Sequence, residues 1–280
     1  DPANIVYTSG TTGPSKGVVQ PFRWMNQYSL TGRQTANADD VMYCDLPLYH
    51  VGGAFFLVTR AIWQGNTVGL WDKFSPTQFW QRIDECGATY CVLVDVMVPW
   101  LVNAPARDDD RLHTLTKVHM QPLPANHHEV ARRFGFDLVT VGFGQTESGL
   151  AFVGVIDEFG SDRPVSDPAY EGTPAGRWRG LPKADYLARC RALGRNVLDG
   201  RQPVPKGYMG CASPLFDVAI LDEEDNPCPP GSVGQLALRP RFPGIILHEY
   251  FRKLEATAKV FRNCWFHTGD AARATTDGSG

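Results

Sequence analysis

The sequence predicts an α/β fold in which a mostly parallel sheet, with helices on both faces, is followed by a small antiparallel β region. Three observations support this fold class. Short apolar runs alternate with helical patterns in the first half, paired apolar runs flank turn-forming residues in the second, and 280 residues allow a large core. We expect an α/β part over residues 1–156, an insertion rich in Pro, Gly and Arg over 157–206, and a β-rich part over 207–280.

Six short apolar runs in the first half are interpreted as strands of the parallel sheet. Ligands of such sheets bind at the carboxyl ends of the strands. The glycine-rich loop after the first run is therefore expected at a ligand-binding edge. The six runs are Ile5–Thr8, Val41–Cys44, Thr67–Trp71, Thr89–Val94, Lys117–Met120 and Leu138–Val141.

Two helices between these strands have clear end signals. In residues 75–87, Ser75 is a natural N-cap, Gln78 completes a capping box and Gly87 is a stop. A second helix is expected from Asn126 to Gly135. The adjacent histidines at its start, His127 and His128, are interpreted as surface residues because their side chains should diverge and no further metal ligand accompanies them.

The second half of the sequence shows a different pattern of apolar residues. Residues 218–239 read as two apolar runs around a turn, which predicts antiparallel strands. The insertion before them contains one helical pattern over residues 183–194. Residues 177–195 hold six basic residues against one acid, and we interpret this stretch as a solvated surface.

Composition excludes several classes of protein. Apolar residues make up 43%, charged residues 20%, and the net charge is −3, which gives no sign of nucleic-acid binding. No apolar run is long enough to span a membrane, and the N-terminus does not resemble a signal peptide. We expect a cytoplasmic protein with reduced thiols, since the cysteines are odd in number and unclustered: Cys44, Cys86, Cys91, Cys190, Cys211, Cys228 and Cys264. The missing initiator Met suggests a piece of a longer protein.

The loop YTSGTTGPSKG, residues 7–17, has the composition of a phosphate-binding loop. Its glycines free backbone N–H groups, its Ser and Thr residues add hydroxyl donors, and Lys16 adds a positive charge. A Walker A loop requires Gly before the lysine and a hydroxyl residue after it. Here Ser15 precedes Lys16 and Gly17 follows, so that match fails.

Four motifs in order resemble those of the adenylate-forming superfamily, which includes acyl-CoA synthetases, peptide adenylation domains and luciferases. Within that superfamily, the sequence around the motifs is most similar to the acyl-CoA synthetases. The carnitine/crotonobetaine-CoA ligase type is the nearest match. The resemblance covers nearly the whole chain. The motifs are YTSGTTGPSKG (7–17), LPLYHVGG (46–53), GFGQTE (142–147) and WFHTGD (265–270).

The resemblance implies ATP-dependent activation of a carboxylic acid to an acyl-adenylate, followed by transfer to coenzyme A. The implied cofactors are ATP or AMP, Mg²⁺ and coenzyme A. Catalytic roles fall on Lys16, Thr146, Glu147 and His50, with Glu147 as the metal ligand and His50 bordering the acyl pocket. The implied nucleotide contacts are Thr8, Ser9, Gly10, Thr11, Thr12, Gly13, Lys16, Gly142, Phe143, Gly144, Gln145, Thr146 and Asp270.

The chain departs from the family pattern in two places. Residues 119–124 read HMQPLP, so Met120 and Gln121 replace the small residues that usually support adenine. Phe143 stands where the family usually has Tyr. The resemblance also implies a smaller domain with a catalytic lysine, which we expect to lie outside these 280 residues, so the chain alone is expected to be poorly active.

Some alternatives stay open at this point. A catalytically degenerate nucleotide-binding module and an adenylation domain that loads a carrier protein are rival functions. Asp95, in an otherwise apolar run, is interpreted as a strand-end or helix N-cap residue, or else as a counter-charge for a cationic substrate. The basic stretch 177–195 could instead meet the phosphates of coenzyme A. A homodimer is possible, and the acid itself is not predicted.

Overall fold

The computed structural model describes residues 1–8, 14–33, 36–160 and 178–275. The chain divides into two compact units, each assembled from separate stretches of sequence. The first comprises Asp1–Tyr28, Gly144–Ala151 and Ala212–Gly280, and the second comprises Ser29–Phe143 and Phe152–Cys211. We had expected continuous segments, but the hairpin around residue 147 carries the chain out of one unit and back.

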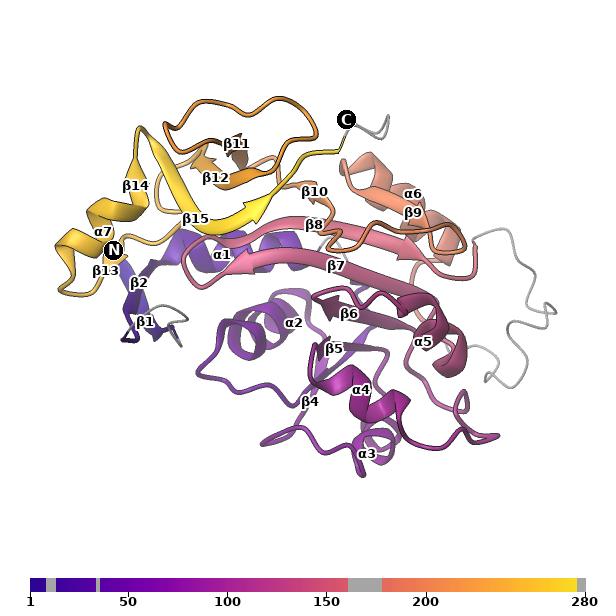
Figure 1. Cartoon of the computed structure of the whole chain (residues 1–280). Helices are drawn as coiled ribbons and strands as arrows, with labels where there is room; N and C mark the ends of the chain where they lie inside the picture. The colour runs from indigo at the N-terminus through magenta and orange to yellow at the C-terminus, as the bar shows by residue number, and fades with distance from the viewer. Residues whose placement is uncertain (9–13, 34–35, 161–177, 276–280) are drawn as a thin grey trace. The chain divides into compact units, whose positions relative to one another are not determined.

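The second unit is built around a sheet of eight strands, and its central strands are parallel. Strands β7 and β8 are neighbours joined by a three-residue turn, which makes the sheet mixed (Figure 1). This confirms the predicted α/β class. The order is β10-β8-β7-β6-β5-β3-β4, with β9 on β8, and the bounds are β3 Val41–Cys44, β4 Thr67–Leu70, β5 Tyr90–Val94, β6 Lys117–Gln121, β7 Leu138–Gln145, β8 Gly149–Asp157, β9 Asn196–Asp199 and β10 Cys211–Ala212.

The helix stops are confirmed but one helix start is wrong. Gly87 and Gly135 end their helices in the left-handed conformation. The helix expected from Ser75 begins at Phe79, because the Ser75 hydroxyl lies against that of Thr77 and the Gln78 amide oxygen accepts from Arg82. The helices are α1 Phe22–Arg33, the π-helix η1 Gly52–Thr59, α2 Arg60–Gln64, α3 Phe79–Cys86, α4 Met97–Val102, α5 His127–Phe134, α6 Lys183–Ala192 and α7 Leu254–Val260.

The described part of the insertion belongs to the core of the second unit, and the surface interpretation was wrong there. Helix α6 buries Tyr186, Leu187 and Cys190 against Leu138 and Val155. Strand β9 pairs in parallel with β8. The helical pattern predicted over residues 183–194 is confirmed, while the basic residues on its outer side obscured its apolar face.

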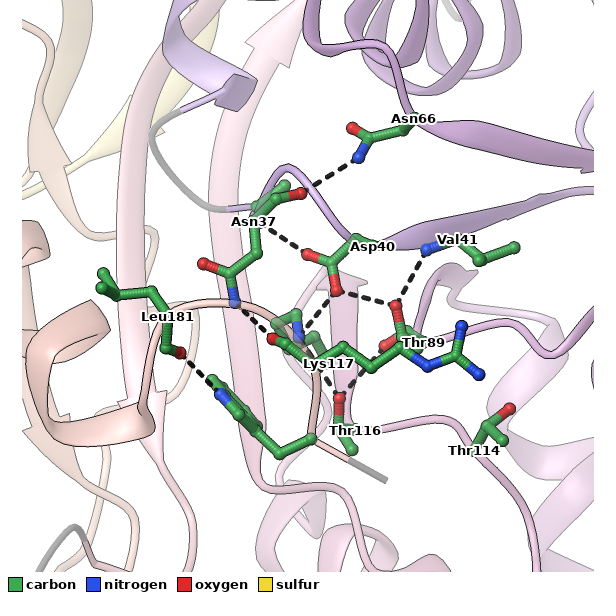
Figure 2. Close-up of polar contacts among 12 residues, drawn as sticks. Asn37, Asp40, Val41, Asn66, Thr89, Thr114, Thr116, Lys117 and Leu181 are labelled. Atoms are coloured by element: carbon green, nitrogen blue, oxygen red, sulfur yellow. Dashed lines mark hydrogen bonds and ion pairs between the residues drawn. The ribbon is translucent and has the colours of Figure 1, made fainter. Parts of the chain in front are cut away.

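A buried ion pair anchors this insertion at the amino end of the parallel strands (Figure 2). The Nζ of Lys117 lies 2.8 Å from Oδ1 of Asp40, and both side chains are fully buried. The ammonium also lies 4.1 Å above the ring of Trp178, within the insertion. Thr89 donates to Asp40 Oδ1 at 2.7 Å, so the carboxylate is held from two sides. A buried charge pair requires such supporting hydrogen bonds.

The two histidines of α5 are less exposed than the sequence suggested, since His127 is buried and His128 is half-buried. Glu158 is fully buried, and its two carboxylate oxygens lie 2.6 Å from Nδ1 of His127 and 2.7 Å from Nδ1 of His128. His127 is itself buried. The side chains converge on one carboxylate that the sequence pattern did not indicate. Within the described residues, no group of His, Cys, Asp and Glu side chains, this one included, is arranged so that it could hold a metal ion.

The first unit contains two small antiparallel sheets. One has the order β1-β2-β13, and the other has the order β11-β12-β15-β14. The hairpin predicted over residues 218–239 is confirmed as β11 and β12 (Figure 1). The bounds are β1 Pro2–Tyr7, β2 Gly17–Pro21, β11 Phe216–Leu221, β12 Gly234–Pro240, β13 Glu249–Tyr250, β14 Phe261–Arg262 and β15 Trp265–Ala272.

The position predicted for the opening loop was wrong. It connects β1 and β2, which are antiparallel, and therefore does not follow a strand of the parallel sheet. The first apolar run could not reveal this, because strand residues look alike in either kind of sheet. In the described ranges, no helix is both long enough and apolar enough to cross a bilayer. All seven cysteines are free thiols.

Candidate nucleotide and acid site

The base of the opening loop is fixed by strand pairing. The backbone N–H of Thr8 donates to the carbonyl of Lys16 at 3.0 Å, which closes the loop where β1 and β2 separate. Gly17 lies against Ile5, so close that a Cβ would come within 2.9 Å of its Cγ2. Five predicted contacts lie outside the described residues: Ser9, Gly10, Thr11, Thr12 and Gly13.

Lys16 and Glu147, 131 positions apart in sequence, meet on opposite parts of one tyrosine. The Nζ of Lys16 lies 4.5 Å from the ring centroid of Tyr250. The hydroxyl of Tyr250 donates to Oε1 of Glu147 at 2.8 Å. Tyr250 was not among the predicted site residues. It lies in the stretch EYFRKLEATAKVF, residues 249–261, shortly before the WFHTGD motif, but no spacing rule connects it to Glu147.

Strand pairing holds Tyr250 in place. Its strand β13 is antiparallel to β2, with Tyr250 opposite Val18, and its backbone N–H donates to Oγ1 of Thr257 at 2.9 Å. The side chain is buried. Burial, assisted by the charge of Glu147, raises the pKa of the Tyr250 hydroxyl. It is therefore a protonated donor at neutral pH.

The turn between β7 and β8 presents Thr146 and Glu147. The amide of Gln20 donates to the carbonyl of Thr146 at 2.8 Å, and the N–H of Leu247 donates to the carbonyl of Glu147 at 2.7 Å. Gly149 follows with φ of +67°, and a Cβ there would lie 2.1 Å from the amide oxygen of Gln27. The turn thus depends on a glycine and on neighbouring backbone contacts.

Asp270 is joined to the same turn through Gln145. The Nε2 of Gln145 donates to Oδ2 of Asp270 at 2.7 Å and to the carbonyl of Thr268 at 2.9 Å. Partial burial raises the pKa of the Asp270 carboxyl, and the Gln145 hydrogen bond opposes this shift. The Oε1 of Gln145 is buried and has no hydrogen-bond partner in the described part of the chain. A ligand hydroxyl or amine could donate to it.

The remaining predicted residues belong to the second unit. His50 accepts a hydrogen bond on Nδ1 from the N–H of Gly52 at 3.1 Å, so the neutral ring carries its proton on Nε2. Partial burial lowers the pKa of His50, although the residue keeps an exposed surface. Gly53 has no room for a side chain, since a Cβ would lie 2.6 Å from the carbonyl oxygen of Pro47.

The strand residues Gly142 and Phe143 are half-buried near the carboxyl end of β7. The ring of Phe143 packs edge-on against Phe152, with centroids 6.0 Å apart. Asp95 is exposed immediately after β5, as expected of a strand-end residue, but the N-cap of α4 is Val96.

The structure therefore groups the predicted residues into two sets. Lys16, Gly144, Gln145, Thr146, Glu147 and Asp270 lie in the first unit, together with Thr8. His50, Gly142 and Phe143 lie in the second. Within the first set, Tyr250 links the lysine to the glutamate and Gln145 carries the aspartate, which brings a cation, two carboxylates and amide donors into one unit.

The sequence matches the model of a protein family described as AMP-binding enzyme over residues 1–242. The chain belongs to the AMP-binding enzyme family. Among curated proteins, this family member is 27% identical to a crotonobetaine/carnitine–CoA ligase of Salmonella heidelberg (strain SL476) over 286 residues. The alignment covers 99% of the chain and 46% of that ligase. The corresponding ligase of Escherichia coli O157:H7 is 28% identical over the same lengths. The chain thus spans about half the length of these curated relatives.

Solved structures share the fold of this AMP-binding family member. ATP-bound MatB from Rhodopseudomonas palustris superposes with a TM-score of 0.69 at 24% identity, over 99% of this chain and 47% of MatB. The o-succinylbenzoate CoA synthetase MenE from Bacillus subtilis, solved with the acyl-adenylate OSB-AMP, gives 0.69 at 20% identity, over 99% of this chain and 60% of that one. At these identities the likeness shows the fold alone.

Glu147 suits a magnesium ion. Its Oε1 is held by Tyr250, while the described residues offer Oε2 no hydrogen bond. Magnesium is commonly bound by one or two carboxylates together with phosphate oxygens and water, and a full cage of protein ligands is not required. Glu147 fits that pattern, because its carboxylate is half-buried and Oε2 is available while Oε1 accepts from Tyr250.

Proposed function

We propose that the complete protein activates a carboxylic acid with ATP and then transfers the acyl group to coenzyme A. The observation that carries this proposal is the Tyr250 contact that joins Lys16 to Glu147, beside the Gln145–Asp270 pair. The curated relatives are named CoA ligases, and related structures were solved with ATP and magnesium or with an acyl-adenylate, which supports the same reaction class.

In the first step, a carboxylate oxygen of the acid attacks the α-phosphorus of ATP, and the bond to pyrophosphate breaks. Negative charge accumulates on phosphate oxygens, so the protein acts chiefly by positioning and charge stabilisation. Lys16 would neutralise phosphate charge, and the Thr146 hydroxyl would donate to the α-phosphate. Glu147 would hold Mg²⁺, which supplies Lewis-acid neutralisation of the phosphate charge.

The nucleoside would be held by the Gln145–Asp270 pair. The carboxylate of Asp270 would accept hydrogen bonds from the ribose hydroxyls, and Gln145 would keep that carboxylate oriented. The Oε1 of Gln145 could accept a further hydrogen bond from the ligand. Phe143 would stack on the base, and His50 would border the acid. In the second step, the coenzyme A sulfur attacks the acyl carbon, AMP leaves, and the thioester forms.

The experiment that tests this function offers the complete protein ATP, Mg²⁺, coenzyme A and a panel of carboxylic acids. Mass spectrometry should detect an acyl-CoA and AMP with at least one acid. Glu147→Gln removes the carboxylate but keeps a hydrogen-bond acceptor for Tyr250, so it should fold and lose most of the turnover. Formation of acyl-adenylate without thioester, until a phosphopantetheine carrier is added, would favour a carrier-loading enzyme. Nucleotide binding without either product would favour a module that lacks catalysis.

Three expectations are not decided by this proposal. The cytoplasmic location, a homodimer and the role of the basic stretch near α6 stay predictions. In that stretch, Lys183 pairs with Asp157 at 2.8 Å and Arg195 is buried, so fewer charges face solvent than the sequence suggested.

A further inference from the structure

A chain of hydrogen bonds crosses three strands of the second unit and ends at the carboxyl end of β6. The hydroxyl of Tyr90 on β5 lies 3.2 Å from Oγ1 of Thr140 on β7. That hydroxyl lies 3.0 Å from Nδ1 of His119 on β6. The Nε2 of His119 lies 3.0 Å from Oε1 of Gln121, the last residue of β6.

These groups have little freedom because they are buried. Tyr90 and Thr140 are fully buried, and His119 is 3% exposed. Burial, together with the charge of Arg60, lowers the pKa of His119 to about 4, although its hydrogen bond with Gln121 acts the other way. At neutral pH the imidazole is therefore uncharged, with one nitrogen that donates and one that accepts.

These hydrogen bonds can run in two directions, but in only one of them does every buried donor have an acceptor. With the proton of His119 on Nε2, that nitrogen donates to Gln121, Thr140 donates to Nδ1, and Tyr90 donates to Thr140. In the reverse direction, Thr140 would donate to the Tyr90 oxygen, and the buried Tyr90 O–H would have no acceptor in the part of the chain that the structure describes. Leaving a buried donor without a partner is costly, so the first direction holds.

The direction fixes the orientation of the Gln121 amide. Its oxygen faces His119, and its Nε2 group, with two N–H donors, is turned away. Gln121 is half-buried, and no described residue accepts from its Nε2. His119, two residues earlier on the same face of β6, packs its ring 4.6 Å from that of Phe56 in η1. The free donors therefore lie on the side of the sheet that carries η1, the helix that directly follows His50.

We propose that Gln121 selects the acid substrate by donating a hydrogen bond to an acceptor oxygen on its chain, such as a carbonyl or hydroxyl oxygen. This inference rests on the proposed function, because it assumes that the acid occupies the carboxyl edge of the sheet beside His50. An unsubstituted alkyl acid of the same length would shield the N–H donors of Gln121 from water but offer them no hydrogen-bond acceptor. A site built to hydrogen-bond a substrate group discriminates strongly against the analogue that lacks it.

The first test compares matched acids in the complete protein. Oxo acids, hydroxy acids and alkyl acids of equal length, from three to six carbons, are assayed for kcat/KM of thioester formation. The wild type should prefer an oxo or hydroxy acid over its alkyl counterpart by about 10-fold or more. Gln121→Leu should abolish this preference. Gln121→Glu keeps the shape and the acceptor for His119 but loses the donors, so it should reject oxo acids and retain hydroxy acids, which can donate.

The KM for ATP separates the acid from the nucleotide as the group that Gln121 contacts. It should be unchanged in both variants. A raised KM for ATP with intact acid preference would overturn the proposal and assign the amide to adenine. An alkyl-preferring wild type would overturn it as well.

A second measurement is independent of activity. The ¹⁵N chemical shifts of the His119 ring should show protonation at Nε2 in the wild type. Thr140→Val removes the donor to Nδ1 and should shift the ring toward the other tautomer, while weakening the acid preference. An Nδ1-protonated ring in the wild type would contradict the direction of the chain. If no acid is activated, the proposed function fails, and the tautomer still reports on how Gln121 is oriented.

Discussion

Replacing Tyr250 with Phe removes the hydroxyl that holds Glu147 and keeps the ring beneath Lys16. The lost contact is a 2.8 Å hydrogen bond to a carboxylate. Hydrogen bonds to charged groups contribute about 1.5–3 kcal/mol, and Glu147 is half-buried, so the lower figure applies. About 1.5 kcal/mol corresponds to a roughly tenfold change in affinity. We therefore expect the apparent affinity for Mg²⁺, measured at fixed ATP, to fall about tenfold.

The assay for this variant follows metal binding and turnover separately. Calorimetric titration of Mg²⁺ into the complete protein with a non-hydrolysable ATP analogue gives affinity, and acid-dependent turnover against free Mg²⁺ gives the functional counterpart. Thr257→Val is the matched control. It removes the acceptor of the Tyr250 backbone N–H and so disturbs the same strand without touching the hydroxyl. If Tyr250→Phe titrates like the wild type, or if the control shifts the metal affinity equally, Tyr250 does not orient the glutamate.

Further predictions concern other parts of the molecule. Asp270→Ala should weaken AMP and ATP binding alike, by about 1.5–3 kcal/mol, because both ligands carry the ribose; equal titration curves for variant and wild type would contradict this. Lys117→Met should lower the free energy of unfolding by about 3–5 kcal/mol, since it leaves Asp40 buried without its counter-charge; chemical denaturation measures it, and Lys117→Met with Asp40→Leu should restore part of the loss. Lowering the pH from about 6.5 toward 4 should destabilise the protein, because unfolded His119 takes up a proton that the folded ring, with its pKa near 4, does not. His119→Asn should flatten this part of the stability–pH curve. The 280-residue chain alone should bind AMP and ATP weakly and make almost no thioester, which a side-by-side assay with the complete protein can check.

The strands were predictable because their signals are local. All six apolar runs of the first half became strands, and Val41–Cys44 matched its run residue for residue. Helix stops at glycines were equally local. The start of α3 was not, because the side chains of Ser75 and Gln78 found other partners. The capping pattern names the residues that can cap, but competition for their hydrogen bonds is decided by the folded neighbours.

In the candidate site, too, local sequence signals were predictive and long-range contacts were not. Motif order made Lys16, Glu147 and Asp270 candidates, and Gln145, which contacts Asp270, lies in one of the motifs. The connection between Lys16 and Glu147 depends on Tyr250, which lies outside all four motifs. Tyr250 reaches Glu147 only because β13 pairs with β2, a long-range pairing that no periodicity encodes. The convergence of His127 and His128 on Glu158 was missed for a related reason. Adjacent positions on a helix normally diverge, and only the buried carboxylate between them reveals the exception.

We propose above all that the complete protein joins a carboxylic acid to the α-phosphate of ATP. The most direct measurement is the exchange of radiolabelled pyrophosphate into ATP by the complete protein, with and without each acid of the panel. Formation of an acyl-adenylate is reversible, so label should enter ATP only when a suitable acid is present, and Glu147→Gln should reduce the exchange strongly. Exchange that does not depend on any acid, or its absence with every acid despite measurable ATP binding, would contradict the account.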